Sequence, residues 1–148
     1  MLTWEGGLWK VNDNDSITDR MLSLEEYIND LSEHSPLEIE QYKNNKLLSR
    51  FIERTLHLAI ESFLDIGNHI ISKNRLGEVN YNSDVVRLLA KNDIVKKNKQ
   101  KYIQMVQFRN VLVHDYSDID PEIIIDIVNN RLSDLKNLFR WYKEHLNI

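Results

Sequence analysis

The sequence predicts an all-α fold, a helical bundle of four long helices with short accessory helices, from two observations. Turn-forming residues are scarce, with four Gly and two Pro in 148 residues, and 28% of the residues are charged, a composition typical of long helices. Apolar residues also recur every three or four positions through several long stretches, which places them on one face of an α-helix. A chain of this length is expected to form a single core.

The first fourteen residues are the exception to the helical pattern. Residues Leu2 to Val11 alternate around Gly6-Gly7, which is typical of a β-hairpin. Because an isolated hairpin is only marginally stable in water, residues 1–14 are interpreted as a tail or hairpin without an assigned function. Residues 15–148 are interpreted as the helical domain.

Helix boundaries in the first third follow from capping residues. Asp15 and Ser16 are candidate caps of a long helix that ends near His34-Ser35. Ser35-Pro36 then matches the N-cap and first position of a second, short helix that reaches about Lys43. The apolar stripe of the long helix steps by three and four residues: Ile17, Met21, Leu24, Tyr27, Ile28 and Leu31.

Four further helical stretches complete the chain. The longest runs from about Lys46 to Lys73, and its apolar face is broad enough to contact neighbours on two sides, so we expect it to be the central helix. Ser83 is the predicted cap of a short helix to about Ala90, and Asn92-Asp93 are expected to open the next long helix. Asp120-Pro121 should start the last helix as cap and first position.

The distribution of charge and the absence of Cys limit the function. A net charge of −4 argues against a general nucleic-acid coat protein, and a chain without Cys has no disulfide and no zinc–thiolate site. No apolar run approaches a membrane span and no apolar leader is seen, so we expect a soluble, cytoplasmic protein. The stretch Ile94 to His114 nevertheless has no acidic residue and five cations: Lys96, Lys97, Lys99, Lys101 and Arg109.

Arg109 and His114 stand at the end of this basic stretch, and Tyr116 follows. An Arg keeps its proton and presents a planar fork that suits a phosphate, whereas His can take up or give a proton near neutral pH. The pair therefore supplies charge stabilisation and proton transfer, two requirements of phosphodiester cleavage without a metal. As a generic pattern, a surface Arg and a His at a helix C-terminus explain the same residues.

The spacing Arg109, His114, Tyr116 resembles the R-x4-H-x-Y signature of the HEPN superfamily, specifically the HepT toxins that pair with minimal nucleotidyltransferase antitoxins. Asn110 after the Arg suits the same pattern. The similarity extends to further blocks in register and covers about Ser16 to the C-terminus: Leu58-Ala59-Ile60-Glu61, Asp65-Ile66-Gly67-Asn68-His69-Ile70 and Asp118-Ile119-Asp120-Pro121.

This resemblance implies a HEPN-type bundle and a homodimeric endoribonuclease that needs no metal or other cofactor. It implies that Arg109 and His114 are catalytic and that the antitoxin transfers AMP from ATP to Tyr116. Because the positive charge is gathered beside the motif, we expect Lys96, Lys97, Lys99 and Lys101 to bind RNA. The chain carries no Gly-rich phosphate loop of its own. The alternative is a non-catalytic HEPN partner of a nucleotidyltransferase that keeps Arg109 as an anion-binding or nucleotide-binding residue.

A polar stripe runs along the expected central helix, where His57, Glu61, Asp65 and His69 are spaced by four residues. A metal site is disfavoured because the di-iron bundle pattern needs Glu-x-x-His, and we expect His57 and Glu61 to be solvated or mutually paired. The resemblance implies a supporting role for Asp65, Asn68 and His69, which would orient the Arg or the His.

The motif poses a geometric problem. Residues five apart on a helix point about 140° away from each other, so Arg109 and His114 do not share a face, whereas Asn110 and His114 do. Either the helix ends near Val113 and the loop turns His114 back, or the long Arg side chain reaches across. A symmetric dimer would help in both cases, because it brings two motif His residues together as base and acid.

Overall fold

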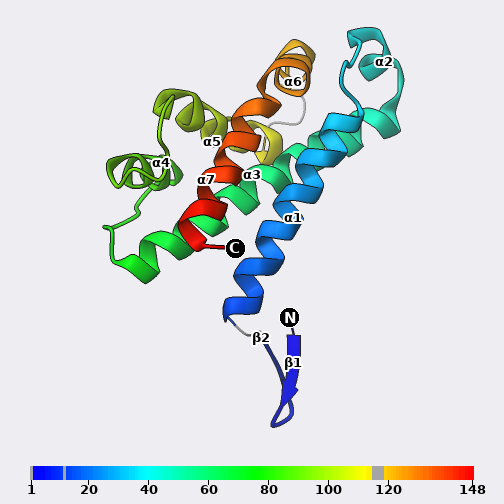
Figure 1. Cartoon of the computed structure of the whole chain (residues 1–148). Coiled ribbons are helices and arrows are strands. Elements are labelled where there is room, and N and C mark those ends of the chain that lie inside the picture. The colour runs from blue at the N-terminus through cyan, green and yellow to red at the C-terminus, as the bar shows by residue number, and fades with distance from the viewer. Residues whose placement is uncertain (1, 12, 115–118) are drawn as a thin grey trace.

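The computed structural model describes residues 2–11, 13–114 and 119–148. The bundle is built from α1 (Asp13–Glu33), α3 (Lys46–Asn74), α5 (Lys99–His114) and a C-terminal rod that comprises α6 (Pro121–Asp126), η2 (Ile127–Arg131) and α7 (Leu132–Leu146). Figure 1 shows α1 lying along the long central helix α3. Helix α7 packs against α1 and contacts α3 through Tyr142. The short helices α2 (Ile39–Asn44) and α4 (Asn82–Lys91) lie at its periphery. The predicted bundle of four long helices with accessory ones is confirmed.

Helix α3 is central because its apolar residues face neighbours on two sides. It begins after Asn45, whose side chain accepts a hydrogen bond from the Leu48 N–H, and it ends at Arg75 in the left-handed conformation with φ 53°. Both ends lie within two residues of the prediction. The expected broad apolar face is buried, from Ile52 to Ile71.

Three aromatic side chains join the central helix to two other helices of the bundle. Phe63 of α3 packs against Tyr102 of α5 and Tyr142 of α7, with both pairs of ring centroids 6.1 Å apart. Each buried phenol donates to a backbone carbonyl, Tyr102 to that of Asp134 at 2.7 Å and Tyr142 to that of Phe63 at 2.9 Å. Burial raises the pKa of both phenols above the usual value, so they remain donors.

The second helix starts later than expected. The prediction of Ser35 as N-cap and Pro36 as first helical position is wrong, because α2 begins at Ile39 after the N-cap Glu38. The intervening Leu37 is buried, and its backbone pairs with the Asn129 side chain, which accepts from the Leu37 N–H at 2.6 Å and donates to its carbonyl at 2.9 Å. The Asn129 side chain therefore occupies the Leu37 N–H and carbonyl, whose hydrogen bonds would belong to the first turn of a helix that began at Pro36.

The helix that carries the motif also starts later than expected, at Lys99 instead of Asn92-Asp93. Residues 92–98 form a turn in which Asp93 and Asn98 have φ of 59° and 60°. The turn folds back on the end of α4, because the N–H groups of Ile94 and Val95 both bond to the Leu89 carbonyl. Lys96 and Lys97 therefore precede α5 instead of extending its face.

The short helix α4 has a different cap from the one expected. Its N-cap is Tyr81 and not Ser83. The Asp84 carboxylate reaches back to accept from the N–H groups of Asn80 at 3.1 Å and Tyr81 at 2.9 Å. These hydrogen bonds lower the pKa of Asp84, which keeps the carboxylate charged at the positive end of the helix.

The start of the C-terminal rod is as predicted, and its middle is not. Asp120 accepts a hydrogen bond from the Glu122 N–H at 2.9 Å, and Pro121 is the first helical residue. The single expected helix is interrupted by the π-helical segment η2, a rare geometry that often occurs at functional sites. The segment places Asn129 against Leu37, as described above.

The N-terminal strands form the predicted hairpin. Strands β1 (Leu2–Glu5) and β2 (Leu8–Val11) pair antiparallel with Glu5 opposite Leu8, and Gly6 and Gly7 have φ of 56° and 85°. Both central residues of the turn thus need the left-handed region that Gly adopts at little cost. In Figure 1 the hairpin extends beyond the N-terminal end of α1. Within the described ranges, no helix is both long and apolar enough to cross a membrane.

Side chains of α4 and α7 pack directly against Gly67 of α3. A Cβ at this position would lie 2.6 Å from Val85 Cγ1 and 2.9 Å from the Tyr142 hydroxyl. We therefore expect Gly67→Ala to lower the free energy of unfolding by about 1–3 kcal/mol, the usual cost of overpacking. Urea denaturation checks this value, with Ser62→Ala on the same helix as the control. A Gly67→Ala variant as stable as the wild type would contradict the packing of these three helices.

Candidate active site

The last two turns of α5 carry the three motif residues that the structure describes. Asn110 and His114 are exposed and Arg109 is half-buried. The helix ends at His114, one residue after the expected end near Val113, and His114 is its last helical residue, so His114 does not lie in a loop that turns back toward Arg109. No hydrogen bond or ion pair joins Arg109 to His114 within the described part of the chain.

Arg109 instead reaches from α5 to α3, where its Nε donates to Glu61 Oε1 in an ion pair. The two side chains are 24% and 29% exposed, so the pair is screened by solvent only in part. An Arg has five N–H donors, and this contact engages the Nε side of the guanidinium. The two terminal nitrogens form a fork that suits a phosphate.

Glu61 also has a second partner on its own helix. His57 Nε2 lies 3.3 Å from Glu61 Oε1, and His57 Nδ1 lies 3.2 Å from an Arg54 terminal nitrogen. Because Arg54 can only donate, this arrangement favours the tautomer of His57 with its proton on Nε2. The expected pairing of His57 with Glu61 is confirmed, but the role of Glu61 as the partner of Arg109 was missed. Its place in the polar stripe was the available signal.

Asp65, Asn68 and His69 line a groove of about 510 Å³ on the neighbouring part of α3, together with Arg20 of α1, Ser72 and Lys73. Desolvation raises the pKa of Asp65, and the Glu61 charge adds to this effect, whereas Arg20 and Arg109 oppose it. Asp65 therefore lies within electrostatic range of Arg109. The residue that directly holds Arg109 is Glu61, one turn earlier on α3.

The four lysines expected to bind RNA are all exposed, but they do not form one helical face. Lys96 and Lys97 lie in the turn before α5, and Lys96 Nζ is 3.3 Å from Glu144 Oε2 at the end of α7. Lys99 and Lys101 lie in the first turn of α5, about four helical turns from His114. Tyr116, the expected site of modification, lies outside the described residues.

Comparison with known proteins identifies the family. A family model described as ribonuclease HepT-like matches residues 24–140. The chain belongs to the HepT-like ribonuclease family. The predicted resemblance is thereby confirmed, and so is the enzyme class, a ribonuclease.

Two HepT-like relatives have been named for the RNA on which they act. The mRNA nuclease HepT of Shewanella oneidensis is 30% identical over 97 residues, which cover 65% of this chain and 73% of that protein. The tRNA nuclease HepT of Aphanizomenon flos-aquae is 27% identical over 131 residues, which cover 88% and 89%. Two members of one family thus carry different RNA classes in their names.

Two of the solved structures with the same fold contain a toxin and its antitoxin. One is a toxin–antitoxin complex with AMP-PNP, with a TM-score of 0.80, 25% identity and coverage of 88% of this chain and 99% of that chain. Another is the tri-AMPylated HEPN toxin of Shewanella oneidensis in complex with an MNT antitoxin, with a TM-score of 0.79, 25% identity and coverage of 90% and 99%. The all-α HEPN bundle predicted from the sequence is confirmed by these similarities.

Proposed function

We propose that this HepT-like protein is the toxin of a toxin–antitoxin pair and acts as a metal-independent endoribonuclease. The observation that carries the proposal is the arrangement at the end of α5. There Arg109 is held through Nε by Glu61, which leaves its terminal nitrogens for a phosphate, and the exposed His114 stands five residues later. The family supplies the substrate class, RNA.

The chemistry that these groups can perform is an internal transfer at phosphorus. The ribose 2′-oxygen forms a bond to the adjacent phosphorus, the bond from phosphorus to the 5′-oxygen of the next nucleotide breaks, and a cyclic phosphate and a free 5′-hydroxyl result. One motif His accepts the proton of the 2′-hydroxyl. A second motif His, which is protonated, donates a proton to the departing 5′-oxygen. Arg109 stabilises the charge that develops on the phosphoryl oxygens.

A homodimer would supply the acid and the base together. Because α5 is continuous through His114, one protomer presents its motif Arg and His about 140° apart on the helix. A twofold axis next to the end of α5 would place each Arg109 beside the partner's His114 and bring two His side chains to one scissile phosphate. We propose Asp65, Asn68 and His69 as residues that support this cleft, and Asn110 as a polar neighbour of His114.

The test uses purified protein and labelled single-stranded RNA of mixed sequence, with the DNA of the same sequence as control. RNA should be cut to products with cyclic phosphate or 3′-phosphate ends, and DNA should remain intact because it lacks the 2′-hydroxyl. Chelators should leave the rate unchanged. Cleavage that chelators abolish would contradict the mechanism, and a protein that binds but never cleaves RNA would favour the non-catalytic HEPN module.

We further propose that a nucleotidyltransferase antitoxin inactivates the toxin by transferring AMP to Tyr116. The sequence places this phenol two residues after His114. Transfer would join the phenol oxygen to the α-phosphorus of ATP and release pyrophosphate. The added AMP brings bulk and negative charge, which would occupy the position of an RNA phosphate at Arg109 and leave the fold intact.

In cells that carry the cognate antitoxin, we expect Tyr116→Phe to stay as toxic as the unopposed wild-type protein. Mass spectrometry of the coexpressed wild type should find AMP on the peptide that contains Tyr116. Tyr81→Phe, which changes an exposed phenol on another part of the surface, serves as the control and should be neutralised normally. Full neutralisation of Tyr116→Phe would refute the proposed modification site.

A further inference from the structure

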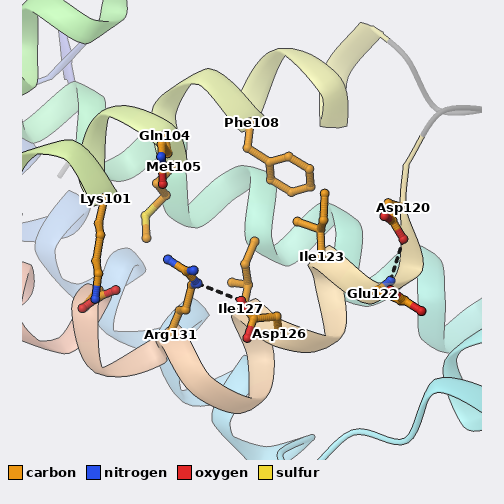
Figure 2. Close-up of a pocket in the computed structure, with 11 residues that line it drawn as sticks. Lys101, Gln104, Met105, Phe108, Asp120, Glu122, Ile123, Asp126, Ile127 and Arg131 are labelled. Atoms are coloured by element: carbon orange, nitrogen blue, oxygen red, sulfur yellow. Dashed lines mark hydrogen bonds and ion pairs between the residues drawn. The ribbon is translucent and has the colours of Figure 1, made fainter.

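A second cavity lies on the other side of α5 from the Asn110 and His114 face. It encloses about 410 Å³, within the range of small-molecule sites. Figure 2 shows Phe108 of α5 pointing across the cavity toward Ile123 of α6, and Met105 pointing toward Arg131 of η2. Apolar side chains thus form the opposing walls, among them Met105, Phe108, Ile123 and Ile127.

Arg131 supplies a planar hydrogen-bond donor in this cavity. Its Nε donates to Asp126 Oδ2 at 2.8 Å, and its two terminal nitrogens point toward Met105 in Figure 2. Asn130 donates to the other oxygen of Asp126 at 2.9 Å. These hydrogen bonds from Asn130 and Arg131 lower the pKa of Asp126, so the carboxylate stays charged and holds the guanidinium in place. The π-helical segment η2 is the element that presents Arg131 here.

The charges around the cavity favour an uncharged group as its occupant. Four carboxylate residues line it, against the two cations Lys101 and Arg131: Asp120, Glu122, Asp126 and Asp134. A phosphate would be repelled from this excess of negative charge. Lys101, which lines the cavity, belongs to the stretch expected to bind RNA. The RNA phosphates can therefore contact Lys101 while an uncharged base enters the cavity.

The side chains that line the cavity indicate which uncharged group it could bind. Phe108 offers a flat ring on which a base can stack. The terminal nitrogens of Arg131 match the pair of adjacent acceptors, O6 and N7, on guanine, the edge to which Arg binds in a bidentate manner. Phe108 also directly precedes Arg109 in the chain, so the cavity and the phosphate-binding fork lie on adjoining faces of one helical turn.

We propose that this cavity is a base-binding subsite that selects an unpaired guanine near the scissile phosphate. The proposal rests on the ribonuclease function proposed above. Phe108 stacks on the base and Arg131 reads its edge, so the first sets affinity for any base and the second sets the preference for guanine. The cavity would therefore determine where within an RNA the protein cuts.

The test measures binding apart from cleavage. Fluorescent 2′-O-methyl uridine octamers, which lack the attacking hydroxyl, carry one central guanosine, adenosine, cytidine or uridine. The wild type should bind the guanosine octamer about 5- to 100-fold more tightly than the uridine octamer, the range of one bidentate base contact. Arg131→Lys keeps the positive charge and loses the planar fork. It should remove the preference for guanosine without lowering the affinity for the uridine octamer.

Phe108→Ala should weaken all four octamers by about 5- to 100-fold, as the loss of one stacking contact does. Phe108→Leu keeps apolar packing and loses the flat ring, so it should weaken binding similarly while folding normally. Phe51→Ala is the control, because Phe51 is 44% exposed on α3 and packs on His34 outside the cavity. Its dissociation constants should equal those of the wild type.

Equal affinity of the wild type for all four octamers, or unchanged binding by both Phe108 variants, would overturn the proposal. Size-exclusion chromatography adds a further check. If Phe108→Ala prevents formation of the dimer or of the antitoxin complex and leaves the RNA affinity unchanged, the cavity is part of a protein interface and not a base-binding subsite. Guanine-selective binding without any RNA cleavage would refute the proposed ribonuclease function alone, and cleavage without base selectivity would refute the subsite alone.

Discussion

The His114→Ala protein is expected to cleave RNA about 10²- to 10⁴-fold more slowly than the wild type, the usual contribution of a general acid or base. His114 is exposed at the end of α5, so its removal disturbs no buried packing and the fold should be retained. The measurement is the single-turnover cleavage rate of a labelled RNA. His145→Ala, which removes another exposed His from the last turn of a helix, should leave that rate unchanged.

A mixing experiment extends the same prediction to the dimer. If one site needs His114 from both protomers, an equal mixture of wild-type and His114→Ala chains should lose activity per wild-type chain. After subunit exchange the loss should be about half, because about half of the wild-type chains then sit in mixed dimers. Activity per wild-type chain that is independent of the added variant would show that each protomer carries a complete site.

The Arg109→Ala protein is expected to lose about 10²- to 10³-fold in kcat, comparable to the removal of one transition-state hydrogen-bond donor. Arg109→Lys should recover little of this loss. A guanidinium can bind Glu61 through Nε and a phosphate through its two terminal nitrogens, whereas a lysine ammonium has no such fork. The matched control is Arg87→Lys on α4, where the Arg pairs with Asp84 at 3.3 Å, away from the proposed site. Circular dichroism and urea denaturation establish that each variant is folded.

Glu61 variants test how the guanidinium is held. Glu61→Ala should lower kcat less than Arg109→Ala, because it frees the Arg109 side chain without removing its charge. Glu61→Gln should lie closer to the wild type, since the amide oxygen can still accept from Nε. A Glu61→Ala protein with full activity would contradict the role of this ion pair in orienting Arg109.

Local sequence determined much of the fold. The long helices are encoded by apolar spacing that each segment carries within itself, so the ends of α3 were predicted within two residues. Hydrogen bonds between near neighbours are equally local, which explains why Asp120 and Pro121 mark the start of α6 as expected. The hairpin turn at Gly6-Gly7 follows from the freedom of Gly at positive φ.

Contacts with residues outside each segment decided three of the features that were missed. The late start of α2 depends on Asn129, which is 92 positions from Leu37. The late start of α5 depends on a turn that bonds back to Leu89, and η2 departs from the regular period that the apolar stripe indicates. In each case a backbone hydrogen bond or a packing contact outside the segment replaces the geometry that the segment alone would favour.

The same division applies to the candidate site. The sequence by itself led to the proposal of which residues bear the chemistry, because Arg109 and His114 stand out by their type and by their spacing within one motif. Only the tertiary structure decided what each faces: Arg109 turns to Glu61, 48 positions away, while His114 faces solvent. The physical reason is that a helix sets the angle between two of its own side chains, but their partners come from whichever helix packs against each face.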